Sequence, residues 1–474
     1  MAAADPSLWA KLESPPPRPL PAGRAGAVFC FGSCFHPSRR VERLELVVDG
    51  VRHRPAAWPM PRADLPTYRS GFWATVPLPA RDRPGAIEIE AAVRLAGAGE
   101  LTAPLGRVEV VEPEEPPAHG SAAIAVCMAT FEPEMSLFRT QIESLKAQTE
   151  TDWICVVSDD CSAPDRFEAI EAAVAGDPRF VVSRSPERLG FYRNFERALR
   201  MAPRGAELVA LCDQDDRWFP EKLERLRAGL GDAVLVYSDQ RLVDSEGRVL
   251  QPTLWKGRRN NHTNLASLLV ANSLTGAAAL FRRDLLDLAL PFPDTPGLQF
   301  HDHWIALVAL AAGRVAYLDQ PLYDYVQHAG AVFGEMSSEE PLRRRLPRPR
   351  GLMQRWRAAY FYGYLGREVQ AQVLLARCAG RLDRGKRRAL ERFASAERSL
   401  RAVAWLALRP LRAIVGRNET LGSELDLVRG LLWRRIVVLR AWLPGRRADA
   451  RFPHAGPESF EQIRLRRWRA RLHR

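Results

Sequence analysis

Residues 122–160 read AAIAVCMATFEPEMSLFRTQIESLKAQTETDWICVVSDD, a helical stretch between two short apolar runs. The same alternation of apolar runs and helical stretches continues along the chain. Two more helical stretches follow, together with the further apolar runs RFVVSRS and ELVALCD. The four runs start at residues 122, 153, 179 and 207. Spacing of this kind is typical of right-handed βαβ units. The stretch therefore predicts an α/β fold with a parallel sheet.

Polar residues end three of these runs: Thr130, Asp159–Asp160 and the segment Asp213–Asp216. In open parallel sheets, ligands bind in the crevice at the carboxyl ends of the strands. We therefore expect these residues to gather in one crevice.

The segment Asp213–Asp216 reads DQDD and places three carboxylates within four residues, where they repel one another. No glycine-rich phosphate loop follows the first run, which excludes a P-loop or dinucleotide fingerprint. A nucleotide diphosphate bound here would need Mg²⁺ or Mn²⁺ held by carboxylates, with phosphate and water completing the coordination. The alternative is a solvated strand end before a capped helix, with Pro220 near its start. The cluster alone leaves both interpretations open.

Composition limits the class of protein. The 474 residues contain no run of about 18 apolar residues, so we expect no transmembrane helix. The proline-rich N-terminus lacks the apolar core of a signal peptide. Seven cysteines are scattered without a paired framework, which favours a reducing cytoplasm.

Charge is divided unevenly along the chain. Residues 341–474 contain 33 Lys and Arg against 10 Asp and Glu, a net charge of +23, whereas the first 340 residues carry −10. The basic tail interleaves Arg with Leu, Val, Ile and Trp, a pattern typical of helices that lie on anionic membranes. Packing of these helices on the rest of the protein or on a second subunit stays open. Nucleic-acid binding is disfavoured because no nucleic-acid-binding motif accompanies the charge.

The N-terminal region has a different pattern. Residues 27–112 alternate apolar and polar positions and carry turn signals such as Asp49–Gly50, which predicts a small β-sandwich. Residues 113–120 read as a linker. Four aromatics of this region could stack on glycans, but we favour core positions for them: Trp58, Tyr68, Phe72 and Trp73.

Six segments together resemble a known family. IAVCMATFEPEM, VVSDDCSAPD, RLGFYRNFERAL and LCDQDDRWFPEKL resemble, in that order, the nucleotide-sugar half of family 2 glycosyltransferases with the GT-A fold. NSLTGAAALFRRDLL and HDHWIALVALAAGRVAYLDQPLYDYVQH resemble the acceptor half, especially of the rhamnosyltransferase branch. The resemblance covers about residues 122–335. It implies a GT-A, Rossmann-like domain preceded by the β-sandwich and followed by the basic helical region.

We accordingly expect four parts: a disordered N-terminus (1–24), a β-sandwich accessory domain (25–112), a GT-A domain (121–335) and a basic helical C-terminal region (345–474). The resemblance also assigns roles to individual residues. It implies Asp302 as catalytic base, and His328 as a metal ligand beside Asp213 and Asp215. Donor-binding roles fall on Thr130, Glu132, Asp159, Asp160, Asn194, Asp213 and Asp215. Acceptor roles fall on Asn272, His303, Trp304 and Trp255.

Two departures from the family pattern bear on donor binding: the opening reads ATFEP, and Arg188 replaces the usual Asn before the third helix. A cationic loop at 255–264, with Lys256, Arg258 and Arg259, could close over the diphosphate or stack Trp255 on the acceptor sugar.

The resemblance implies a metal-dependent, inverting transferase that moves a sugar, such as rhamnose from dTDP-rhamnose, to a cell-envelope polysaccharide or lipid-linked precursor. The alternatives are a galactofuranosyl- or hexosyltransferase with a UDP-sugar donor, and a non-catalytic glycan-binding or scaffold protein. We expect a cytoplasmic protein, peripheral on the inner face of the membrane. Homo-oligomerisation stays open, and no nucleic-acid partner is expected.

Overall fold

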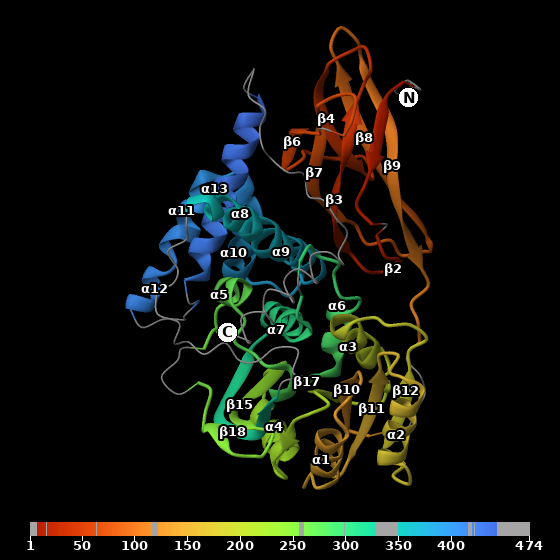
Figure 1. Ribbon diagram of the computed structural model, residues 1–474, viewed down its shortest axis with the longest axis vertical. Coiled ribbons are helices and arrows are strands. Elements are labelled where there is room, and N and C mark those ends of the chain that lie inside the picture. The colour runs from red at the N-terminus through yellow and green to blue at the C-terminus, as the bar shows by residue number, and fades with distance from the viewer. Residues whose placement is uncertain are drawn as a thin grey trace.

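The computed structural model describes residues 7–15, 17–62, 64–115, 122–255, 260–297, 299–328, 349–415, 420 and 422–442. Figure 1 shows three parts: a β-rich N-terminal part at one end, an α/β part at the other, and a group of C-terminal helices beside their junction.

Two sheets form the N-terminal β-sandwich, one in the strand order β1-β3-β7-β6 and the other in the order β2-β9-β8-β4-β5. Apolar residues from both sheets, such as Phe72 and Ile89, form a common buried core. The predicted Asp49–Gly50 turn joins β4 and β5, and both of its residues have positive φ, at 49° and 76°. The strands are β1 (Trp9–Leu12), β2 (Leu20–Pro21), β3 (Gly26–Phe35), β4 (Val41–Val48), β5 (Val51–His53), β6 (Ala57–Pro61), β7 (Arg69–Leu78), β8 (Gly85–Leu95) and β9 (Glu100–Val111).

The second part is built on a nine-stranded sheet in the order β12-β11-β10-β13-β17-β15-β18-β14, with β16 paired to β15. Its first four strands are mutually parallel, and β17 runs antiparallel to β13. The strands are β10 (Ile124–Thr130), β11 (Trp153–Asp159), β12 (Phe180–Arg184), β13 (Leu208–Cys212), β14 (Arg217–Trp218), β15 (Leu235–Asp244), β16 (Val249–Gln251), β17 (Ala279–Arg282) and β18 (Val315–Gln327).

The strand–helix alternation expected from the sequence is confirmed. The four parallel strands start within two residues of the expected positions, and their side chains form one continuous core with the surrounding helices. The helices of this part are α1 (Met135–Lys146), α2 (Pro164–Val174), α3 (Phe191–Arg200), α4 (Lys222–Leu230), α5 (Leu265–Val270), α6 (Leu286–Ala289) and α7 (His301–Ala312), with 3-10 turns η1 (Gly276–Ala278) and η2 (Arg283–Leu285).

The C-terminal helices pack on both other parts. On the sandwich side, the indole of Trp73 donates a 3.0 Å hydrogen bond to the hydroxyl of Tyr360, and Thr75 donates one of 2.8 Å to Glu368. On the α/β side, Arg367 donates to the carbonyl of Leu269 at 2.9 Å. The elements are α8 (Pro349–Ala358), the π-helical turn η4 (Ala359–Tyr364), α9 (Leu365–Arg377), α10 (Arg384–Ala394), η5 (Ser395–Glu397), α11 (Leu400–Leu408), α12 (Leu411–Ile414) and α13 (Ser423–Trp442).

This packing covers some of the apolar residues of the tail and leaves others exposed. Leu406, Trp433 and Val437 are buried within the protein, at 0%, 4% and 6% exposure, so they have no surface to offer a membrane. Leu408 and Leu432 are exposed. None of the described helices combines the length and apolar character needed to cross a bilayer.

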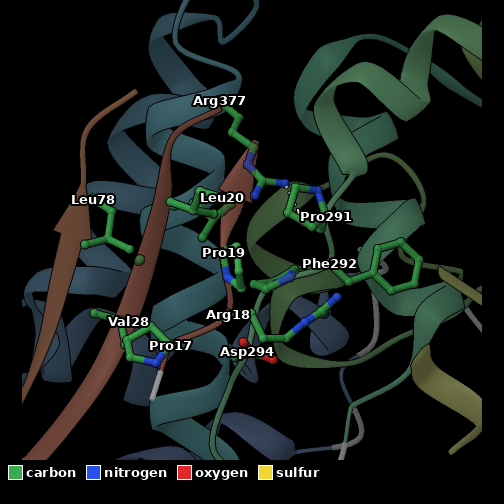
Figure 2. Close-up of a pocket in the computed structure, with 14 residues that line it drawn as sticks. Pro17, Arg18, Pro19, Leu20, Val28, Leu78, Pro291, Phe292, Asp294 and Arg377 are labelled. Atoms are coloured by element: carbon green, nitrogen blue, oxygen red, sulfur yellow. Dashed lines mark hydrogen bonds between the residues drawn. The ribbon is translucent and has the colours of Figure 1, made fainter. Parts of the chain in front are cut away.

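A small cavity of about 40 Å³ lies where the segment Pro17–Leu20, β3, the loop after α6 and α9 meet (Figure 2). Arg377 lines it and donates to the carbonyl oxygens of Ala25 at 2.7 Å and Pro291 at 2.8 Å. A drug-sized ligand occupies a pocket of about 300 Å³ or more. The cavity is therefore a packing gap where the three parts meet, too small to be a substrate site.

The fold predicts that the C-terminal helices are part of the folded core. Phe361 is 3% exposed, and its ring lies 5.4 Å from that of Trp73 and 5.6 Å from that of Trp433. Phe361→Ala should lower the free energy of unfolding by about 3–5 kcal/mol, because it leaves a cavity. Leu400→Ala, at a position 66% exposed, should change it by less than about 0.5 kcal/mol. Equal effects of the two substitutions in urea denaturation would show that the helices are not part of this core.

Candidate active site

The carboxyl ends of β10 and β11 lie side by side, with Thr130 directly opposite Asp159 in the strand register. The Thr130 hydroxyl donates to Asp159 Oδ1 at 3.2 Å. Ser162 donates to the same carboxylate twice, from its backbone N–H at 2.8 Å and its hydroxyl at 2.6 Å. Asp159 is fully buried, and these bonds fix the loop that follows β11.

Asp160 and Asn194 also make bonds that shape this edge. Asp160 accepts from the backbone N–H groups of Leu189 at 2.5 Å and Gly190 at 2.9 Å, which fixes the start of α3, and burial raises its pKa. Asn194, on α3, donates to the carbonyls of Thr130 at 3.1 Å and Ser158 at 2.8 Å. Its own side-chain oxygen accepts from the Ser158 hydroxyl at 2.6 Å. The amide therefore joins the two strand ends to the helix.

Glu132 lies just beyond β10, with a positive φ of 42°. Its carboxylate accepts from the backbone N–H of Ala163 at 2.6 Å, at the start of α2. Its own N–H donates to the Ser162 hydroxyl at 2.8 Å. Among the residues expected to bind the donor, it is the most exposed in this loop.

Gln214 joins the loop after β13 to the loop after β10. Its side chain accepts from the backbone N–H of Phe131 at 2.8 Å and donates to the same residue's carbonyl at 3.3 Å. The guanidinium of Arg188 lies 3.8 Å from the centre of the Phe131 ring. The crevice predicted from the strand ends is thus a set of loops tied to one another.

The carboxylates of the DQDD segment occupy different surroundings. Burial, followed by the charges of Asp215 and Asp302, raises the pKa of Asp213 to about 7. Asp216 is buried and its pKa lies well above the usual range; one of its oxygens accepts from Val326 N–H at 3.3 Å, and the other has no partner in the described part of the chain. Asp215 Oδ2 lies 2.8 Å from His328 Nε2, and this hydrogen bond raises the pKa of His328.

The carboxylates of the DQDD segment and His328 are the residues to compare with the ligands that a metal ion requires. Within the described residues, no group of three or more His, Cys, Asp or Glu side chains is placed to hold a metal ion. Asp215 and His328 provide a pair of adjacent donors, and Mg²⁺ is commonly held by one or two carboxylates together with substrate phosphates and water. Burial and the neighbouring carboxylates disfavour the ionised forms of Asp213 and Asp216, as their raised pKa values show, and a bound cation would offset this by stabilising the ionised carboxylates. The donor set therefore fits a metal that arrives with a diphosphate.

Asp302 lies in the first turn of α7, close enough to Asp213 for its charge to raise the pKa of that residue. Its carboxylate accepts from the His303 N–H at 2.5 Å, from the Gly276 N–H and from the side chain of Asn272. Burial nevertheless raises its pKa to about 7, and its charge in turn contributes to the raised pKa of Asp213. The structure therefore brings together two carboxyl groups that lie 89 positions apart in the sequence.

His301 precedes Asp302 and stacks on Phe195, with ring centres 3.5 Å apart. Burial lowers its pKa to about 3, and neither ring nitrogen has a hydrogen-bond partner in the described part of the chain. A Cβ at Gly276 would lie 2.7 Å from its Nε2, so this close approach requires glycine. Gly276 and His301 together fix the loop whose N–H group reaches Asp302.

The residues expected to bind the acceptor separate into two groups. His303 is buried and pairs through Nε2 with the Leu268 carbonyl at 2.7 Å, and Trp304 is fully buried with its indole N–H bonded to the Ala289 carbonyl at 2.9 Å. Neither has a surface for an acceptor. Asn272 is exposed beside Asp302, and Trp255 is half-buried. Lys256, Arg258 and Arg259 lie outside the described residues.

Lys222 is a buried lysine that the sequence analysis missed. It is 0% exposed, donates to the Ala277 carbonyl in η1, and lies 3.2 Å from the centre of the Trp218 ring. Burial holds its pKa well below the usual range, whereas the charges of Asp216 and Asp213 raise it. The sequence gives little indication of this burial, because a lysine shortly after the WF pair at the start of a helix is ordinarily expected to be exposed to solvent.

Comparisons with known proteins add one family match. Residues 126–288 match the family model described as Glycosyl transferase family 2. This segment contains most of β10, all of β11 to β13 and the DQDD loop. A search of curated proteins finds no match.

Two solved structures illustrate the structural similarity. Residues 1–349 of S. aureus TarS in complex with UDP-GlcNAc share 18% identity, with 66% of this chain and 90% of that chain covered and a TM-score of 0.40. The mannosyltransferase PcManGT from Pyrobaculum calidifontis, in complex with GDP-Man and Mn²⁺, shares 18% identity over 69% and 90% of the two chains, with a TM-score of 0.35. These similarities are too low to support an inference by themselves.

The site geometry predicts that Lys222 holds the DQDD loop and η1 together. Lys222→Met keeps the apolar stem but leaves the Ala277 carbonyl without its donor, so we expect a loss of about 1–3 kcal/mol of unfolding free energy. Lys146→Met removes a surface pair with Glu143 and should change stability by less than about 1 kcal/mol. Wild-type stability of Lys222→Met in urea denaturation would contradict this role.

Proposed function

Because residues 126–288 match the Glycosyl transferase family 2 model, we propose that this site transfers a sugar from a nucleotide-sugar donor to an acceptor hydroxyl with inversion, Asp302 acting as the base. One observation carries the proposal: Asp302 and Asp213 lie close enough for their charges to interact. The first comes from the start of α7 and the second from the end of β13. A base on the acceptor side thus faces a carboxylate cluster on the donor side.

The proposed step is a single displacement. The acceptor oxygen forms a bond to the anomeric carbon, the bond from that carbon to the diphosphate oxygen breaks, and the acceptor proton passes to Asp302. A general base works best when its pKa lies near the working pH, which the pKa of about 7 at Asp302 provides. The three hydrogen bonds that Asp302 accepts hold its carboxylate in one orientation.

We assign the metal, Mg²⁺ or Mn²⁺, to Asp215 and His328, with Asp213 beside them on the ribose or the metal. When bound with the donor, such an ion supplies Lewis acidity toward the leaving diphosphate. Asp216 and Lys222 lie beneath this pair and keep the loop in place.

We assign contact with the nucleoside to Glu132 and to the loop backbone beside it, because Glu132 is the exposed residue among those expected to bind the donor. Thr130, Asp159, Asp160 and Asn194 shape the donor pocket through the hydrogen bonds described above. Gln214 and Arg188 with Phe131 form the neighbouring wall.

For the acceptor, Asn272 is the proposed contact, because it is exposed and bonds to the carboxylate of Asp302. Trp255 stands as a second proposed contact. The finer proposal is transfer of rhamnose from dTDP-rhamnose to a cell-envelope polysaccharide or lipid-linked precursor at the inner face of the cytoplasmic membrane, and it rests on the resemblance of the segments that contain Asn272 and Asp302. A UDP-sugar donor is the alternative.

Replacing the base should remove transfer without removing the fold. In Asp302→Asn we expect kcat for transfer to fall about 10²-fold or more, because an amide cannot accept the proton. Donor affinity, measured by calorimetry with Mn²⁺ and a panel of nucleotide sugars, should stay within about threefold. Asp284→Asn, at an exposed carboxylate in a 3-10 turn, is the matched control. Near-normal turnover by purified Asp302→Asn would refute the assignment.

The pH profile provides a second test of the base. Because the pKa of Asp302 is raised to about 7, the carboxylate is protonated and inactive below that pH. In the wild type, kcat/KM should fall about tenfold per pH unit below 7 and level off above it. A profile flat from pH 5 to 8 would be inconsistent with a base of this pKa.

Replacing the metal ligand should act on the donor. Asp215→Asn should raise the KM for the donor and the Mn²⁺ concentration for half-maximal activity by roughly tenfold or more, because a neutral amide is a weaker ligand for a divalent ion. Asp165→Asn, an exposed carboxylate at the start of α2, should change neither. Full activity after metal stripping with EDTA would show that basic side chains neutralise the diphosphate.

A further inference from the structure

An exposed apolar stripe runs along α11 and onto α12. Leu400, Ala404 and Leu408 recur every four residues on α11, and each is exposed, so they lie on one face of the helix. The stripe continues through Leu411, Ile414 and Val415. The exposed fractions are 66% for Leu400, 62% for Leu408, 53% for Leu411, 80% for Ile414 and 68% for Val415.

The opposite face of the same helix is fixed to the protein. Ala402, Val403 and Leu406 are buried. Arg409, at the end of α11, donates to the Ser267 hydroxyl at 2.7 Å and to the Asn264 side chain at 3.2 Å. The helix is therefore held with one apolar face inward and a second apolar face outward. Figure 1 shows α11 and α12 at the outer margin of the molecule, away from the β-sandwich.

The charged residues within the segment itself are all arginines, of which Arg409 is buried and forms an ion pair with Glu424. Residues 398–415 contain four arginines and no Asp or Glu. Arg398 and Arg401 are exposed. An apolar stripe edged by arginines matches the boundary between headgroups and acyl chains of an anionic bilayer. A second copy of the chain fits less well, because two surfaces that both carry arginines and no acids would repel each other.

We propose that Leu400–Val415 docks the protein on an anionic lipid surface, with the stripe Leu400, Leu408, Leu411, Ile414 and Val415 inserted at the headgroup level. The docking helix is linked to the crevice. Arg409 binds Ser267 on α5, and the Leu268 carbonyl of α5 binds His303, the residue after the base.

The test is co-sedimentation of the full chain with vesicles at low salt. Vesicles of equal parts phosphatidylglycerol and phosphatidylcholine should bind the wild type, vesicles of phosphatidylcholine alone should bind it much less, and added salt should weaken binding. The double variant Leu408→Asp with Ile414→Asp should lose about tenfold or more in affinity, because it places two charges where the bilayer is apolar. Leu250→Asp, at a position 59% exposed on β16, is the matched control and should bind like the wild type.

Two further measurements, thermal stability and donor hydrolysis, separate lipid docking from misfolding and from failure of the proposed function. Thermal midpoints and donor hydrolysis in solution should be the same for the double variant and the wild type. If neither protein hydrolyses any donor, that result counts against the proposed function and not against docking. Wild-type vesicle binding by the double variant would overturn the proposal and assign binding to other basic segments. A wild type that ignores anionic vesicles, or a variant that changes only from dimer to monomer in gel filtration, would also overturn it.

Discussion

The rest of the site depends on one constraint, the close spacing of three carboxylates at the end of β13. Asp213, Asp215 and Asp216 lie within four residues, and burial together with the charge of Asp215 makes Asp213 and Asp216 harder to ionise. The fold compensates only in part, with Lys222 beneath the loop and His328 beside Asp215. One oxygen of Asp216 keeps no partner in the described part of the chain. Ionisation of Asp213 and Asp216 is therefore disfavoured in the protein alone, and a bound cation would stabilise their ionised forms.

The same burial that opposes ionisation of this cluster also prepares Asp302. Its carboxylate accepts hydrogen bonds from a helix start, from Gly276 and from Asn272, all of which favour the charged form, yet burial prevails and its pKa is about 7. Gly276 connects the parts: its N–H reaches Asp302, its lack of a side chain admits His301, and its neighbour Ala277 accepts from Lys222. The proposed base and the proposed donor loop are therefore held by one short turn, η1.

The sequence predicted the parallel strands closely, because each is a compact apolar run with polar residues at its end. It also indicated that Thr130, Asp159 and the DQDD segment would share an edge. It did not reveal Lys222, His301 or the burial of Trp304, because these depend on contacts between segments 50 or more residues apart or on packing from all sides. The tail shows a further limit: leucines and tryptophans that suit a membrane suit a protein core equally well, so the pattern alone could not separate buried Leu406 from exposed Leu408.

We propose that Asp215 and His328 supply only part of a metal site and that the donor completes it. Titration of Mn²⁺ followed by electron paramagnetic resonance, with and without a nucleoside diphosphate from a panel of UDP, GDP and dTDP, tests this directly. We expect weak binding of Mn²⁺ to the protein alone and binding at least about tenfold tighter with the matching nucleotide, because phosphate oxygens would add ligands to Asp215 and His328. Mn²⁺ affinity that is the same with and without every nucleotide would contradict it.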